Sequence, residues 1–90
     1  MAKANVDPTE LRRFARDLSR FNSELETLMN SLHSRLLGLE KTWQDQEQHK
    51  FVKEFEQTMK TLSRFLDSSG RHASFLVKKA RHIEDYLQQH

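Results

Sequence analysis

Apolar side chains recur along the first half of the chain at alternating intervals of three and four residues. The row begins at Leu11, and each of its members is a leucine or a phenylalanine. This spacing places them on one stripe of an α-helix, in the heptad pattern of a helix that packs against another helix. The row consists of Leu11, Phe14, Leu18, Phe21, Leu25, Leu28 and Leu32.

The predicted first helix has a clear start and a shift of phase near its end. Asp7 can cap the helix, Pro8 fits the first helical position, and Glu10 completes a capping box. After Leu32 the apolar row continues in a different phase, which resembles a stutter. We therefore expect a helix over about residues 8–43. The shifted positions are Leu36, Leu39 and Trp43.

A second and longer apolar row fills the other half of the chain. Asp45 can cap this helix, with Gln48 at its third position. The weak helix formers Ser68, Ser69 and Gly70 interrupt the row, but its phase is the same on both sides of them. We therefore expect one continuous helix over about residues 46–88, bent at most. The row contains Val52, Phe55, Met59, Leu62, Leu66, Ser69, Ala73, Leu76, Ala80, Ile83 and Leu87.

Together these patterns predict an all-α fold, an antiparallel two-helix hairpin. The turn falls at about residues 43–45, and such a short connection forces the two helices antiparallel. The 90 residues contain only 2 Gly and 1 Pro, which suits long uninterrupted helices. We expect one domain over residues 7–90, preceded by a flexible tail over residues 1–6.

A hairpin this small buries only one stripe of each helix, and the apolar surface is wider than one stripe. Residues beside the rows widen it, namely Met29, Leu37, Phe51, Phe65, Phe75, Val77 and Tyr86. We expect the hairpin to dimerise into a four-helix bundle, because small domains rarely stabilise themselves alone. The alternative is a monomer with scattered exposed apolar residues. Ser69 and Ala73 are small positions that could accept bulky side chains of the other chain. The expected core and dimer seam comprises Leu18, Phe21, Leu25, Leu28, Leu32, Phe55, Met59, Leu62, Leu66, Leu76 and Ile83.

Composition argues against catalysis, cofactors and metals. The chain has no cysteine, and its five histidines form no ligand pattern. Two isolated glycines cannot build a phosphate-binding loop, and no nucleophile motif is present. We expect a protein that is not an enzyme and that acts through protein–protein contacts. It has no signal-peptide pattern, so we expect synthesis in the cytoplasm and, if the protein is secreted, export without a cleavable signal.

A basic stripe runs along the first turns of the first helix, formed by Arg13, Arg16 and Arg20. It could contact phosphates or anionic lipid. Asp17 interrupts it, and 15 basic residues are nearly balanced by 13 acidic ones. Pairing with a partner's carboxylates is therefore favoured over nucleic acid or membrane. Basic residues near residues 78–81 should lie beside the stripe and make that end of the hairpin basic.

The chain resembles the WXG family of small proteins exported by type VII secretion systems. The resemblance covers residues 7–87 and rests on chain length, the two heptad-patterned helices and the tryptophan at the bend. The family tripeptide is Trp-Xaa-Gly, where this chain has Trp43-Gln44-Asp45. Asp suits this place because it tolerates turns and caps the helix that follows. The resemblance implies that Trp43 and Asp45 form a recognition motif at the bend.

The resemblance also implies a function. Related proteins act as secreted substrates or partners of the export machinery, as dimers with themselves or with a similar hairpin, and they contact the secretion ATPase. Many carry a Tyr-Xaa-Xaa-Xaa-Asp/Glu export signal, but the residue four after Tyr86 is His90. Either a partner supplies the signal, or the protein is an intracellular adaptor or chaperone for the helical domain of a larger effector.

Overall fold

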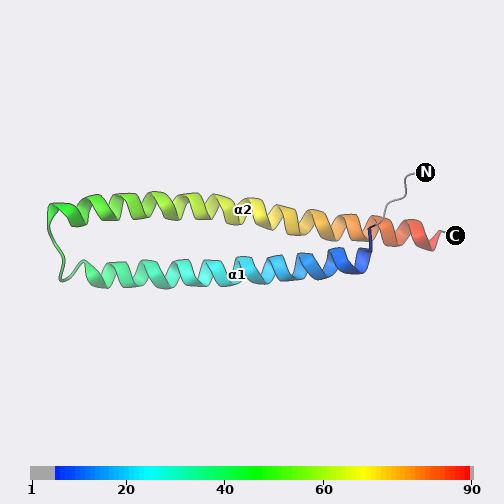
Figure 1. The fold of residues 1–90 in the computed structure, drawn as a ribbon, viewed down its shortest axis with the longest axis horizontal. Helices are drawn as coiled ribbons and strands as arrows, with labels where there is room; N and C mark the ends of the chain where they lie inside the picture. The colour runs from blue at the N-terminus through cyan, green and yellow to red at the C-terminus, as the bar shows by residue number, and fades with distance from the viewer. Residues whose placement is uncertain (1–5, 90) are drawn as a thin grey trace.

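The computed structural model describes residues 6–89, which form two long antiparallel helices lying side by side (Figure 1). Helix α1 spans Pro8–Leu39 and helix α2 spans Gln46–Gln88. The hairpin measures 69 × 21 × 14 Å and is therefore a single layer of two helices. This confirms the predicted fold class. The expected tail over residues 1–6 falls almost entirely outside the described residues.

Helix α1 begins where the sequence predicts but ends earlier. The Asp7 side chain accepts a hydrogen bond from the Thr9 amide at 2.9 Å, and Pro8 occupies the first turn. At the other end the predicted bound of 43 is wrong, because the hydrogen bonds change at Leu39. Its carbonyl accepts from the amides of both Thr42 and Trp43, at 3.0 Å each. The first of these bonds spans only three residues, which tightens the chain into a turn.

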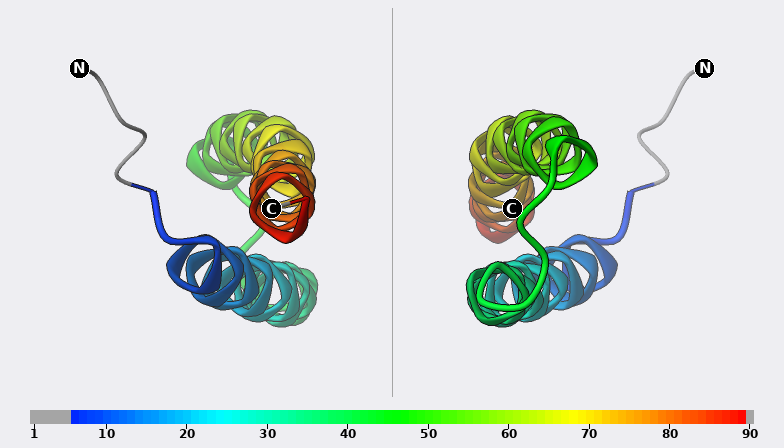
Figure 2. Two further views of the ribbon diagram at one scale, coloured as in Figure 1. Left: turned by 90° about the vertical axis from the view of Figure 1, so that its right-hand side faces the viewer. Right: turned by 90° about the vertical axis from the view of Figure 1, so that its left-hand side faces the viewer.

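Helix α2 is continuous, as the unbroken heptad phase predicts. It passes through Ser68, Ser69 and Gly70 without interruption, and no residue in the described part of the chain has a positive φ angle. Viewed along the long axis, the two helices are inclined to one another (Figure 2). Such a slant is expected when the side-chain ridges of one helix pack between those of the other.

The two helices contact each other through different kinds of side chain. On α2 the predicted row faces α1, except that Leu87 is exposed. On α1 the contact row is rotated from the predicted one. Leu11, Leu18 and Leu25 are half-buried as expected, but their neighbours in the contact are Ala15, Asn22, Met29 and Leu36. The larger side chains at positions 14, 21 and 28 are exposed.

Small residues bring the helices together near the middle and the open end of the hairpin. Ala15, Ser69, Ala73 and Ala80 are buried, and the Ser69 hydroxyl donates a hydrogen bond to Asn22 Oδ1 at 2.8 Å. Short side chains allow the close approach that this bond requires. Ser69 and Ala73 therefore face α1 of their own chain. The expectation that they receive side chains from another chain is wrong.

Candidate interaction surface and bend

One side of the hairpin presents large apolar side chains to solvent. Phe14, Phe21 and Leu28 are exposed on α1 at intervals of seven residues, which places them on one row. Across from them Phe65 is exposed on α2, and its ring meets that of Phe21 edge to face, with 6.3 Å between ring centroids. Exposed apolar surface that is contiguous over two helices is typical of a protein–protein interface. We call it the outer apolar face, comprising Phe14, Phe21, Leu28, Leu32, Phe51 and Phe65.

The predicted seam is divided between the inside of the hairpin and this face. Most of its members are half-buried between the helices, as are Met29 and Val77. Phe21, Leu28 and Leu32 are instead on the outer apolar face, while Phe75 and Tyr86 are exposed elsewhere on α2. The half-buried seam members are Leu18, Leu25, Phe55, Met59, Leu62, Leu66, Leu76 and Ile83.

Three aromatic rings are in contact at the bend. The Trp43 ring is half-buried and lies 5.8 Å from the Phe51 ring, which in turn stacks on Phe55 at 5.9 Å. The Trp43 amide closes the last turn after α1 through the Leu39 carbonyl. Aromatic pairs at this spacing add to the stability gained from burial. Trp43 therefore ties the turn to the start of α2 while part of its ring remains accessible.

Asp45 is the N-cap of α2, and its Oδ1 accepts a hydrogen bond from the Gln48 amide at 2.9 Å. We expect Asp45→Ala to lower the free energy of unfolding by about 1 kcal/mol, because it leaves an amide of the first turn without an acceptor. Urea denaturation followed by circular dichroism measures this loss. Asp45→Asn retains an acceptor and should keep most of the stability; an equal loss in both variants would contradict the capping role.

At the open end of the hairpin an ion pair joins the two helices. Arg12 Nε and Nη2 donate to the two carboxylate oxygens of Glu84, at 2.9 and 2.7 Å. Arg13 pairs with Glu10 at 2.8 Å on the surface of α1. Arg16 and Arg20 are exposed. The basic residues at this end are therefore partly neutralised, and the stripe of Arg13, Arg16 and Arg20 remains a prediction as a contact patch. Arg12 and Glu84, 72 residues apart, were not recognised as partners from the sequence.

This ion pair makes the stability of the hairpin depend on pH. The hydrogen bonds from Arg12 lower the pKa of Glu84; partial burial opposes this, and the charges of Arg12 and Arg81 add to it. A carboxyl group with a lowered pKa in the folded state stabilises the fold above its ordinary value of about 4.3, and less as pH falls. We expect Glu84→Gln to lower the melting temperature at neutral pH and to have a progressively smaller effect below pH 4.

The matched control is Asp85→Asn, which removes a neighbouring exposed carboxylate. Its effect on the melting temperature should be small at neutral pH. Equal effects of the two variants across the pH range would show that net charge, and not the pair with Arg12, is responsible.

Within residues 6–89, no cluster of three or more histidine or acidic side chains is suited to holding a metal ion. Neither described helix is long and apolar enough to cross a membrane.

Comparison with known proteins agrees with this architecture. Crystal structures of EsxB from Bacillus anthracis strain Sterne, a secreted protein, are similar to the chain. One shares 26% sequence identity at a TM-score of 0.81, covering 91% of this chain and 88% of EsxB. A point mutant of EsxB gives 25% identity and a TM-score of 0.82, covering 93% and 97%. Comparison with curated protein sequences finds no match.

A family model extends the likeness to the sequence. The model for WXG100, described as proteins of 100 residues with WXG, matches residues 3–86. The match includes α1, the bend with its Trp43-Gln44-Asp45 tripeptide, and α2 up to residue 86. This chain belongs to the WXG100 family.

Proposed function

We propose that this protein is a substrate or partner protein of a type VII-like secretion system and that it acts as a dimer without catalysis. The observation that carries the proposal is the outer apolar face, displayed on a hairpin of the WXG100 family. The likeness to EsxB, a secreted protein, supports the link to export.

The thinness of the hairpin supports pairing with a second chain. A layer 14 Å thick has no interior of its own, and Leu36 is the only buried residue larger than alanine among the described apolar ones. A second hairpin laid on the outer apolar face would cover Phe14, Phe21 and Phe65 and complete a four-helix bundle. The second chain is either another copy or a similar hairpin protein.

The bend gives the dimer a surface for recognition. Trp43 is partly accessible and is held in place by Phe51 and by the Leu39 carbonyl. In the proposed mechanism, the folded bundle presents this end to the export ATPase or to a larger effector. The outer apolar face is then used for pairing and the bend for recognition.

Two measurements test the proposal. If the protein forms a homodimer, light scattering over a dilution series should give a stable mass of about twice 10.7 kDa. If it forms a heterodimer, the protein should instead co-purify with a co-expressed similar hairpin protein. In the native host, the protein should reach the culture supernatant without lysis and should be retained when the export ATPase is deleted. Retention in both strains would contradict the proposal and favour an intracellular adaptor, a role that His90 in place of an acidic residue also suggests.

A further inference from the structure

A row of exposed basic side chains runs along the edge of α2 that faces away from α1. Each position of this row lies two residues before a member of the row that packs on α1, and therefore points about 160° away from that contact. Seven of the ten positions between residues 50 and 81 are lysine or arginine, and all ten are exposed. We call the seven basic residues the basic edge: Lys50, Lys53, Lys60, Arg64, Arg71, Lys78 and Arg81.

The positive charge of the basic edge is not neutralised within the described chain. Asp67 is the only acidic residue at the ten positions. The ion pairs among residues 6–89 lie at the open end of the hairpin, and none of them involves the edge. Lys60 and Arg64 are four residues apart, and like charges at this spacing on a helix repel each other. An anionic partner laid along the edge would relieve this repulsion.

A hollow of 560 Å³ lies in the second half of the basic edge. It is lined by Gly70 and Ser74, whose small size leaves the space, and by Arg71 and Lys78 of the edge. Phe75 lines it as well and is 60% exposed. Two cations beside a small open space suit a phosphate group. An exposed aromatic ring beside them suits the boundary between the headgroups and the acyl chains of a membrane.

The length and shape of the basic edge favour a flat partner. From Lys50 to Arg81 the edge extends about 46 Å, on a helix that runs the whole length of the hairpin (Figure 1). A hairpin 14 Å thick does not enter the major groove of DNA, which is about 12 Å wide. A straight edge that stays outside the groove meets a duplex at only a few phosphates. A flat lipid surface can contact all seven cations at once.

We propose that the basic edge binds the surface of a membrane that contains anionic phospholipids. Clusters of four to eight Lys and Arg side chains on a helix are typical of such binding. The hairpin lies along the surface, with headgroup phosphates against Arg71 and Lys78 and with Phe75 at the level of the headgroups. Phe65 projects about 120° away from Arg71, so the outer apolar face stays free for a second hairpin.

The test is co-sedimentation of the full chain with vesicles of phosphatidylcholine and phosphatidylglycerol at a ratio of about 3:1. At low salt we expect half of the protein to bind below about 1 mM lipid. Binding should be lost at about 0.5 M salt, where the charges are screened, and should be absent with vesicles of phosphatidylcholine alone. No binding to the anionic vesicles at low salt, or equal binding to the neutral ones, would overturn the proposal.

Two matched triple variants separate the basic edge from general attraction between charges. Lys60→Glu, Arg64→Glu and Arg71→Glu together reverse the middle of the edge and should weaken binding at least about 100-fold. The same change at the three arginines of the basic stripe on α1 alters the net charge equally, but should weaken binding less than about tenfold. Losses of equal size would overturn the proposal. Circular dichroism checks that both variants fold.

Two competitors separate the possible sources of the phosphate groups. Inorganic phosphate should release no more protein from the vesicles than chloride of the same ionic strength, because contacts with many headgroups add together. Duplex DNA should bind more weakly than the anionic vesicles at the same salt and phosphate concentration. Specific release by inorganic phosphate, or tighter binding of DNA, would overturn the assignment to a membrane. The triple variants leave the outer apolar face unchanged, so light scattering shows separately whether the dimer forms.

Discussion

Replacing Phe21 with glutamate is expected to dissociate the proposed dimer. The side chain is 51% exposed in the hairpin, and its ring packs on Phe65 near the middle of the outer apolar face. In a bundle both rings become buried, and a buried aromatic anchor often dominates the binding energy. A carboxylate at this position would also lose its hydration without gaining a partner. We expect the dissociation constant to rise by at least about 100-fold, which light scattering over a dilution series detects as a fall in mass.

Leu37→Glu is the matched control for this prediction. Leu37 is also on α1 and is also 51% exposed. It lies 16 residues from Phe21 and therefore about 160° around the helix, away from the outer apolar face. This variant should keep the mass of the parent protein. If both variants dissociate the dimer, or if neither does, the interface is not where we place it. Circular dichroism at high concentration should show that both remain helical.

Leu36→Ala is expected to destabilise the hairpin more than the loss of either helix cap. Leu36 is 7% exposed and is the only buried leucine of the described chain. It packs near the bend, where α1 and α2 are joined. Truncating a buried leucine to alanine typically costs about 2–5 kcal/mol. We expect about 2–3 kcal/mol, because a thin hairpin can partly close over the space that is left.

Its neighbour in the sequence provides the comparison. Leu37→Ala removes the same atoms from the same helix at a position that is 51% exposed, and should change the free energy of unfolding by less than about 0.5 kcal/mol. Both values come from urea denaturation at one protein concentration, because association adds to apparent stability. Equal losses in the two variants would show that Leu36 is not a core residue in solution.

The sequence was sufficient to predict the parts of the fold that depend on local signals. Asp7 and Asp45 are capping residues followed by apolar rows, and both cap helices in the structure. The unbroken phase across Ser68–Gly70 correctly predicted one helix there. Glycine within a helix costs only about 1 kcal/mol, which a long row of packed side chains readily offsets.

The face that α1 turns toward α2 could not be predicted in the same way. Two adjacent rows on α1 share Leu11, Leu18 and Leu25, and the row with Phe14 and Phe21 is the more apolar. The structure uses the other row, because Ala15 and Asn22 allow the helices to approach closely. A helix that packs against two partners needs both rows, and the periodicity of a single chain does not show which partner takes which row.

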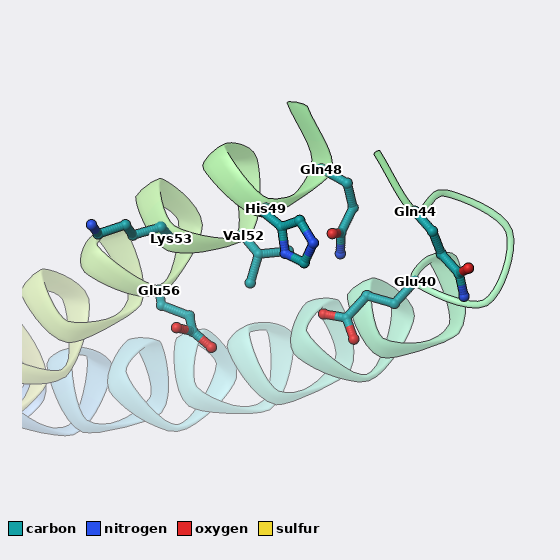
Figure 3. A pocket seen from close by; sticks show the side chains of 7 residues that line it. All are labelled: Glu40, Gln44, Gln48, His49, Val52, Lys53 and Glu56. Carbon is teal, nitrogen blue, oxygen red and sulfur yellow. The ribbon is translucent and has the colours of Figure 1, made fainter. Parts of the chain in front are cut away.

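Contacts between distant parts of the chain were also beyond sequence reasoning. The gap that Glu40 lines at the end of α1, and Gln48 and Glu56 line on α2, depends on where α1 ends (Figure 3). The pair of Arg12 and Glu84 depends on the register of the hairpin in the same way. Charged residues are frequent on both helices, so no single pairing was distinguished by the pattern.

The hydrogen bond between Ser69 and Asn22 gives the hairpin a means of choosing its alignment. Leucines that repeat every seven residues fit almost as well when one helix slides past the other by a whole repeat. Such a slide would place the Asn22 amide against Leu62 or Leu76 and leave a buried polar group unsatisfied. This single polar contact can thereby disfavour the slipped arrangements and fix the register of α1 against α2. The register in turn sets the length of the connecting loop.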